Sequence, residues 1–206
     1  MGMKRVFFYF AVAVVVVAFG LVLKFVVAPL QPPPKSAKVA QIPAPPPVGG
    51  PFTMVNQHGQ TVRDTDFQGR HMLIFFGYTY CPDICPTVLS NVTQALELLG
   101  PAAAKVQPIF VSVDPERDTP DQLKMYLEHF HPTMVGLTGS KQQVEAAKKA
   151  YRVYAAKADQ SADDPDDYLM AHGSTLYLMG PKGEFEAFFS HQSDPQAMAH
   201  RIKEFL

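Results

Sequence analysis

Residues 71–99 read HMLIFFGYTYCPDICPTVLSNVTQALELL, with an apolar run, two cysteines and a helical pattern in immediate succession. The apolar run predicts a buried strand over His71–Gly77, and the pattern after the cysteines predicts a helix over Pro86–Leu99. Cys81 and Cys85 therefore lie where a strand leads into a helix. Backbone N–H groups and the helix dipole favour negative charge there, so both cysteines are expected to form thiolates more easily than free cysteine.

The rest of the globular pattern fits around this unit. The expected elements are, in order, a β-hairpin formed by 52–55 and 61–62, a strand over Val106–Val113, helices over Thr119–Phe130 and Ser140–Tyr151, strands over Ser174–Met179 and Glu184–Phe189, and a helix from Asp194 to Leu206. A strand–helix–strand unit followed by a hairpin and a helix predicts a thioredoxin-like α/β fold. That fold places Cys81 and Cys85, at the first strand-to-helix turn, beside His172 at the entry to the late hairpin.

Composition limits the classes of protein to which the chain can belong. Its 206 residues are enough for a membrane anchor, a linker and one domain of about 150 residues. The 18 Lys and Arg are balanced by 19 Asp and Glu, without the basic stripe of a nucleic-acid-binding protein, so no nucleic-acid partner is expected. Two cysteines cannot build a disulfide scaffold, and the fold must depend on an ordinary hydrophobic core.

Residues 1–28 are predicted to form one N-terminal transmembrane helix. Val6–Leu23 carries no charge and is almost wholly apolar. A span needs about 20 such residues, and Lys24 near the end of this one can reach the lipid headgroups. Lys4 and Arg5 precede it, and positive charge stays on the cytoplasmic side, so the rest of the chain is expected across the membrane.

The alternative for this segment is a cleaved signal peptide, whose apolar core is usually only about 7–15 residues long. Pro29 also stands where it should hinder cleavage, so a retained anchor is preferred. We therefore expect a single-pass protein of a bacterial inner membrane, with a cytoplasmic N-terminus and a periplasmic C-terminal domain. Residues 29–51, which hold nine of the 19 prolines, are interpreted as a proline-rich linker, and 52–206 as the folded domain.

The spacing of Cys81 and Cys85 leaves two arrangements open. If both lie on the helix they share a face; if the first is still in the loop, the pair can close around a metal or form a disulfide. His172 is the candidate third ligand, although a structural or exposed histidine is the alternative. Two thiolates and an imidazole suit Cu(I), and Cu(II) is conceivable, whereas zinc usually takes a fourth donor.

Three motifs in order along the chain resemble those of the Sco/SenC family. They are GYTYCPDICP at 77–86, SVDPERDTP at 112–120 and HGSTLYL at 172–178, and the resemblance covers Phe52–Leu206. It implies a membrane-anchored copper-binding protein with a thioredoxin-like fold, in which Cys81, Cys85 and His172 are the copper ligands. One departure stands out, because many relatives have an aspartate immediately before the histidine and this chain has Ala171.

The resemblance also implies a function and partners. Family members support assembly of the binuclear copper-A centre of cytochrome c oxidase, as copper donors, as thiol reductants, or as both. A copper metallochaperone is therefore the leading hypothesis, with the copper-A subunit, other copper carriers or thiol reductants, and the membrane as partners. The alternative is an extracytoplasmic thiol–disulfide oxidoreductase that keeps target cysteines reduced through redox-active Cys81 and Cys85. A peroxiredoxin-like peroxidase or redox sensor is a weaker third possibility.

The second motif carries three charged residues with two interpretations. Asp114, Arg117 and Asp118 either form a docking loop beside the site or make a local salt-bridged turn. The sequence does not separate these interpretations, because both place the same charges after a buried strand.

Overall fold

The structure, a computed structural model, describes residues 2–27, 48–160 and 167–206 and divides into two compact units, Met1–Pro45 and Pro46–Leu206. Most of the predicted linker, 29–51, lies outside the described residues. In the first unit, α1 spans Met3–Val27. The predicted transmembrane anchor is not confirmed, since a search of the described residues finds no helix with the length and apolarity to cross a membrane.

The second unit is built on a seven-stranded mixed sheet with strand order β2-β1-β5-β4-β3-β8-β9. Its strands are β1 (Thr53–Asn56), β2 (Thr61–Arg63), β3 (His71–Gly77), β4 (Val106–Ser112), β5 (Val135–Thr138), β8 (Leu176–Met179) and β9 (Phe185–Phe189). The helices are α2 (Ile84–Leu99), α3 (Pro120–Leu127), α4 (Lys141–Tyr151) and α5 (Pro195–Lys203). This arrangement confirms the predicted thioredoxin-like α/β fold.

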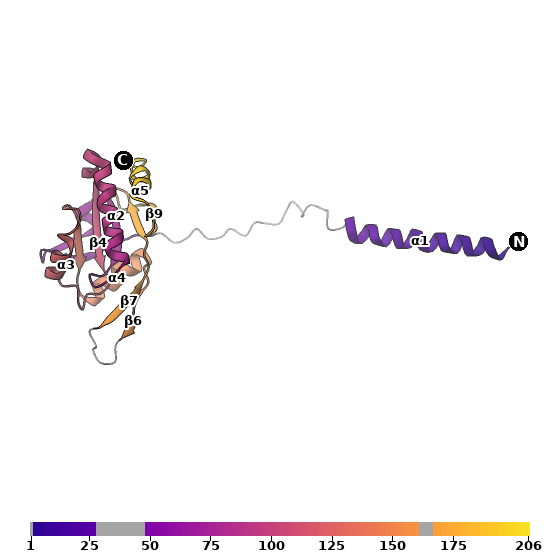
Figure 1. Ribbon diagram of the computed structural model, residues 1–206, viewed down its shortest axis with the longest axis horizontal. Coiled ribbons are helices and arrows are strands. Elements are labelled where there is room, and N and C mark those ends of the chain that lie inside the picture. The colour runs from indigo at the N-terminus through magenta and orange to yellow at the C-terminus, as the bar shows by residue number, and fades with distance from the viewer. Residues whose placement is uncertain (1, 28–47, 161–166) are drawn as a thin grey trace. The chain divides into compact units, whose positions relative to one another are not determined.

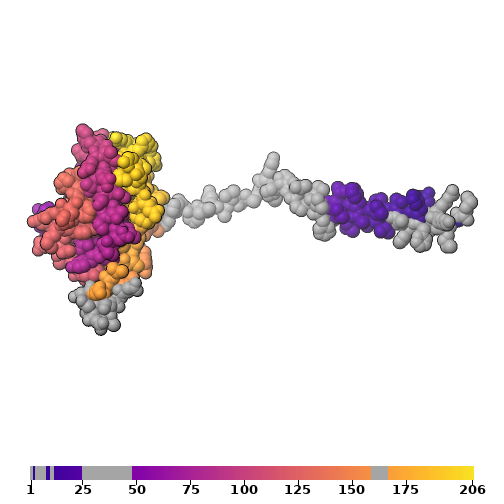
Figure 2. Space-filling view, in the orientation of Figure 1, coloured from indigo at the N-terminus to yellow at the C-terminus, as the bar shows by residue number. Residues whose placement is uncertain are grey.

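A separate two-stranded sheet consists of β6 (Ala155–Gln160) and β7 (Tyr168–His172), which pair antiparallel. Figure 1 shows this β6–β7 hairpin projecting from one end of the unit. In Figure 2, α2 and the yellow α5 lie side by side on the face drawn, consistent with their packing against each other.

The core lies at the centre of the large sheet. Every residue of β3 and β4 is buried, and the two strands run parallel with Ile74 opposite Ile109. Continuous apolar runs of this kind are typical of parallel strands that are covered on both faces. The buried face of α2, which includes Val88, Val92 and Leu96, packs into the same core.

Several local predictions are confirmed. The strand over His71–Gly77 has the predicted bounds, and the early hairpin is present. Thr119 caps α3, because its side chain accepts a hydrogen bond from the Gln122 amide, and Ser140 makes the predicted capping box with Gln143.

The helix boundaries differ from prediction in three places. Helix α3 ends at Leu127 and α5 at Lys203, each three residues before the predicted end. Helix α2 begins at Ile84 and not at Pro86. Proline is tolerated there because the first backbone N–H groups of a helix have no intrahelical partner to lose.

Three strands were not predicted. Strand β5 is only four residues long and has Gly136 in its middle, so its apolar pattern is weak. Strands β6 and β7 consist largely of Ala and polar residues and flank an acidic segment, a composition that does not favour strand. Their omission matters because β7 carries His172.

Candidate metal centre

The two cysteines occupy different local environments at the β3-to-α2 turn. Cys81 lies in the loop and is partly exposed, whereas Cys85 lies in the first turn of α2 and is fully buried. The Cys85 amide donates a hydrogen bond to the Cys81 sulfur at 3.4 Å. Of the two arrangements open to sequence, the structure has the first cysteine in the loop, where both sulfurs can face one metal ion.

His172 reaches the same point as the last residue of β7, followed by a short connection to β8. Its Nε2 lies 3.6 Å from the Cys85 Sγ, and its Nδ1 lies 2.9 Å from the Gly173 carbonyl oxygen. A carbonyl can only accept, so the Nδ1 of the ring carries the hydrogen. In the neutral ring, the Nε2 lone pair therefore faces the sulfurs, as a metal ligand requires.

Two aromatic rings hold the imidazole in place. Phe75 of β3 and Tyr78 of the following loop make edge contacts with the His172 ring, at centroid distances of 6.2 and 5.7 Å. Both aromatic residues are buried. The ring orientation of His172 thus depends on side chains from the cysteine-bearing segment.

The donor atoms of Cys81, Cys85 and His172 all lie within 4.8 Å of one another. Bonds from a first-row metal to thiolate sulfur and imidazole nitrogen are roughly 2.0–2.3 Å long, so two ligands of one ion lie at most about 4.6 Å apart. The cluster therefore fits a metal ion after a small adjustment. Within the described residues, no other His, Cys, Asp or Glu joins this group. Two sulfurs and one nitrogen favour a soft ion such as Cu(I) over zinc.

The two thiols have opposite acidities. The pKa of Cys81 is lowered to about 3, first by a hydrogen bond from Cys85 and further by His172 and the backbone N–H groups of Asp83 and Cys85. The pKa of Cys85 is raised, because its thiol donates to Cys81 and because it is buried. The expectation that both cysteines become thiolates more easily is therefore wrong for Cys85 in the metal-free protein, where one proton stays between the two sulfurs.

Gly77, at the end of β3, leaves the space for Cys85. A β-carbon at this position would lie 2.8 Å from the Cys85 Sγ and 2.8 Å from Phe110. Any larger residue would push the sulfur away from the cluster. The sequence signal was a glycine directly after an apolar strand, which alone has many explanations.

Buried carboxylates fix the loop that carries the cysteines. Asp118 is fully buried and accepts hydrogen bonds from the Thr79 amide, the Thr79 hydroxyl and the Ser112 hydroxyl, the latter two at 2.6 Å. Burial raises the pKa of Asp118, against the effect of these hydrogen bonds. The end of β4 is thus tied to the cysteine loop four atoms of backbone away from any solvent-facing docking surface.

Asp114 and Arg117 form a second buried group. The Asp114 carboxylate accepts hydrogen bonds from Arg117 Nε at 2.6 Å and from the Tyr168 hydroxyl at 2.7 Å. Asp114 is only 2% exposed and Asp118 0%. The local salt-bridged turn is therefore the better interpretation of the second motif, with an added link to β7 that sequence did not predict.

Two other predicted positions lie near the cluster without joining it. His191 has its Nδ1 2.9 Å from the Ser174 hydroxyl and is not among the clustered donors. Ala171 is exposed on β7, where successive side chains point to opposite faces. An aspartate at 171 would therefore point to the face opposite His172.

Comparisons with known proteins were made against this fold and site. The SCO1/SenC family model matches residues 40–206. The SCO2-like protein of Rickettsia felis is 39% identical over 159 residues, 77% of this chain and 75% of that protein. The structure of Bradyrhizobium japonicum ScoI with copper bound has a TM-score of 0.71 and 42% identity, covering 77% of this chain and 99% of that one.

A more distant structure is BsSco, described as having a disulfide switch and as a member of the Sco family of cytochrome c oxidase assembly proteins. Its TM-score is 0.60 and its identity 27%, over 79% of this chain and 94% of that one.

Proposed function

Because the chain belongs to the SCO1/SenC family, we propose that it is a copper metallochaperone that binds the metal through Cys81, Cys85 and His172. The observation that carries this proposal is the convergence of two sulfurs and one imidazole nitrogen within 4.8 Å. The copper-bound relative ScoI, similar over 77% of this chain, supports the choice of metal. Cu(I) is the preferred cargo because thiolates are soft ligands, and Cu(II) is the second.

The site combines retention with access. Cys85 is fully buried, whereas Cys81 and His172 are each partly exposed. An incoming thiol of an acceptor protein could replace the exposed ligands first while Cys85 still holds the ion. Binding of copper would displace the proton that Cys85 keeps in the metal-free protein, so uptake should release acid.

The acceptor in this proposal is the copper-A subunit of cytochrome c oxidase, with other copper carriers as donors. BsSco, a member of the Sco family of cytochrome c oxidase assembly proteins, supports that role by its similarity. We also propose that residues 1–28 anchor the chain in a bacterial inner membrane and that the domain is periplasmic. The apolar run Val6–Leu23, preceded by Lys4 and Arg5, supports this topology.

The test is a titration of the reduced full-length protein in detergent with Cu(I), in competition with a calibrated chelator. We expect one tightly held copper per chain. His172→Ala should weaken binding by more than the roughly 100-fold that loss of an outer-sphere partner costs. The matched control is His191→Ala, which removes a nearby histidine outside the cluster and should leave affinity unchanged. Absence of competitive binding, or binding that ignores His172, would overturn the proposal.

A second function, thiol–disulfide exchange, is favoured by the acidities of the two cysteines. The Cys81 thiolate would attack a target disulfide and form a mixed disulfide, releasing one target thiolate. Cys85 would then lose its proton and attack the Cys81 sulfur, releasing the second target thiol and leaving a Cys81–Cys85 disulfide. A thiol reductant of the same compartment would have to restore the pair. Retention of this activity in His172→Ala, without copper binding in the wild type, would make it the main function.

A further inference from the structure

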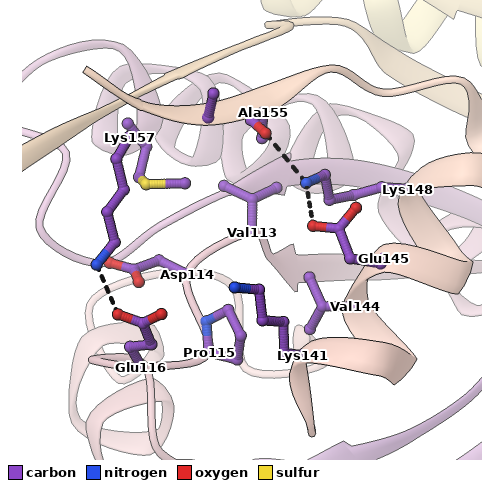
Figure 3. A pocket seen from close by; sticks show the side chains of 12 residues that line it. Val113, Asp114, Pro115, Glu116, Lys141, Val144, Glu145, Lys148, Ala155 and Lys157 are labelled. Atoms are coloured by element: carbon purple, nitrogen blue, oxygen red, sulfur yellow. Dashed lines mark hydrogen bonds and ion pairs between the residues drawn. The ribbon is translucent and has the colours of Figure 1, made fainter.

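The hairpin that carries His172 stands apart from the core. Strands β6 and β7 pair only with each other, and a cavity of about 230 Å³ lies between them, α4 and the loop after β4. Figure 3 shows charged side chains lining this cavity, with Lys157 of β6 paired to Glu116 and Lys148 of α4 donating to the Ala155 carbonyl. Since apolar packing is interrupted here, the position of β7 depends on a few polar and aromatic contacts.

Arg117 makes the most enclosed of these contacts. Its Nη1 donates to the Tyr168 carbonyl at 3.0 Å, and its guanidinium carbon lies 3.6 Å from the centroid of the Tyr168 ring. Its Nε pairs with Asp114, which also accepts from the Tyr168 hydroxyl. The Arg117 side chain is 10% exposed. One buried guanidinium thus holds both the backbone and the ring of the first residue of β7.

The same guanidinium reaches the cysteine loop. It lies 4.6 Å from the centroid of the Tyr80 ring, next to Cys81, and 5.8 Å from that of Tyr78. The Tyr78 ring in turn makes its edge contact with His172. Burial raises the pKa of Tyr78, and a hydrogen bond from the Met170 backbone opposes that rise, so this ring also meets the middle of β7.

We propose that Arg117 is a positioning residue that clamps the β6–β7 hairpin to the cysteine loop and thereby keeps His172 within reach of the two sulfurs. A planar guanidinium can stack on rings and donate in its plane at once, which a lysine cannot do. The exposed Lys157–Glu116 pair, at the outer side of the cavity, is a weaker tie because it is open to solvent.

The inference rests on the proposed function in its first readout, copper affinity. Arg117→Met should weaken Cu(I) binding roughly 10- to 100-fold, as loss of an outer-sphere partner does. In a His172→Ala background the same change should cost no more than about a further twofold, the usual error of such cycles. The matched control Glu116→Gln should change affinity less than about fivefold. X-ray absorption of copper-loaded Arg117→Met should show the two sulfurs retained and the imidazole nitrogen lost or partly occupied.

A second readout needs no copper. In the metal-free full-length protein, backbone amides of β7 should exchange with deuterium faster in Arg117→Met than in wild type, while those of β3 stay unchanged. If Arg117→Met does not fold, Arg117→Lys keeps the charge beside Asp114 and should show both effects at reduced size. Equal affinity losses with and without His172, or unchanged exchange in β7, would overturn the clamp.

The two proposals fail differently. If His172→Ala leaves copper affinity intact, the proposed ligand set is wrong, and hydrogen exchange still decides whether Arg117 holds the hairpin. If His172→Ala weakens binding but Arg117→Met leaves both affinity and exchange unchanged, the ligand set stands and the clamp is wrong.

Discussion

The cysteine-bearing turn and the β6–β7 hairpin supply ligands to one point but are held very differently. The turn follows β3, whose residues are all buried and paired with β4 and β8. The hairpin is a separate sheet above a cavity, held by Arg117, Tyr168 and surface charges. A site built this way has a rigid sulfur pair and a nitrogen whose position can vary. That division suits a protein that must both hold and release a metal.

The largest expected effect is on the rigid side. Cys85→Ser should abolish tight copper binding, because it removes the only buried sulfur, whereas His172→Ala should leave weaker, measurable binding through two thiolates. Cu(I) competition titrations of the two variants side by side test this order. Circular dichroism provides the control for folding, and a Cys85→Ser variant that still binds copper tightly would contradict the division.

The next effect is the difference in reactivity between the two sulfurs. Because the pKa of Cys81 is lowered to about 3, its thiolate persists above that pH and is lost only as pH falls toward it. Alkylation of Cys81 by iodoacetamide should therefore be nearly constant from about pH 5 to 8, whereas an ordinary thiol slows about tenfold per unit below about pH 8.5.

The control for this measurement is the urea-unfolded protein, in which both cysteines should behave as ordinary thiols. Peptide mass spectrometry separates Cys81 from Cys85, whose buried thiol should remain almost unmodified. A Cys81 rate that rises tenfold per unit up to pH 8 would show that the turn does not stabilise a thiolate.

A third prediction compares two glycines, one in each region. Gly77→Ala should destabilise the protein by about 1–3 kcal/mol, because the new methyl group meets the Cys85 sulfur and Phe110. Gly173→Ala, beside His172, should have little effect, since nothing lies within 4 Å of the added carbon. Thermal unfolding measures both, and a loss at least as large for Gly173→Ala would mean that the hairpin end is the more tightly packed.

The smallest effect is expected at the surface of the hairpin. Lys157→Met breaks the pair with Glu116, in which the two side chains are 39% and 53% exposed. Exposed pairs contribute about 0.2–1 kcal/mol, so the unfolding temperature should fall only slightly and the difference should shrink at high salt. A loss as large as that of Gly77→Ala would assign this outer pair a main part in holding β7.

The central unit of the fold was predictable because its signals are local. A continuous apolar run predicts β3, and side chains at fixed offsets predict the caps of α3 and α4. The motif pattern also indicated Cys81, Cys85 and His172 as a group. The strands β6 and β7 were missed, because an Ala-rich hairpin beside acidic residues lacks the alternation that predicts a strand.

The sequence by itself determined the sheet core, the position of the cysteines at a strand-to-helix turn and the identity of three soft donors. Only the tertiary structure decided that the Cys81 thiolate accepts hydrogen bonds while Cys85 keeps its proton, because acidity depends on burial and on neighbours from other segments. It also decided that Arg117 joins Tyr168 to the cysteine loop. Those contacts link residues about 50 positions apart, and no local pattern records them.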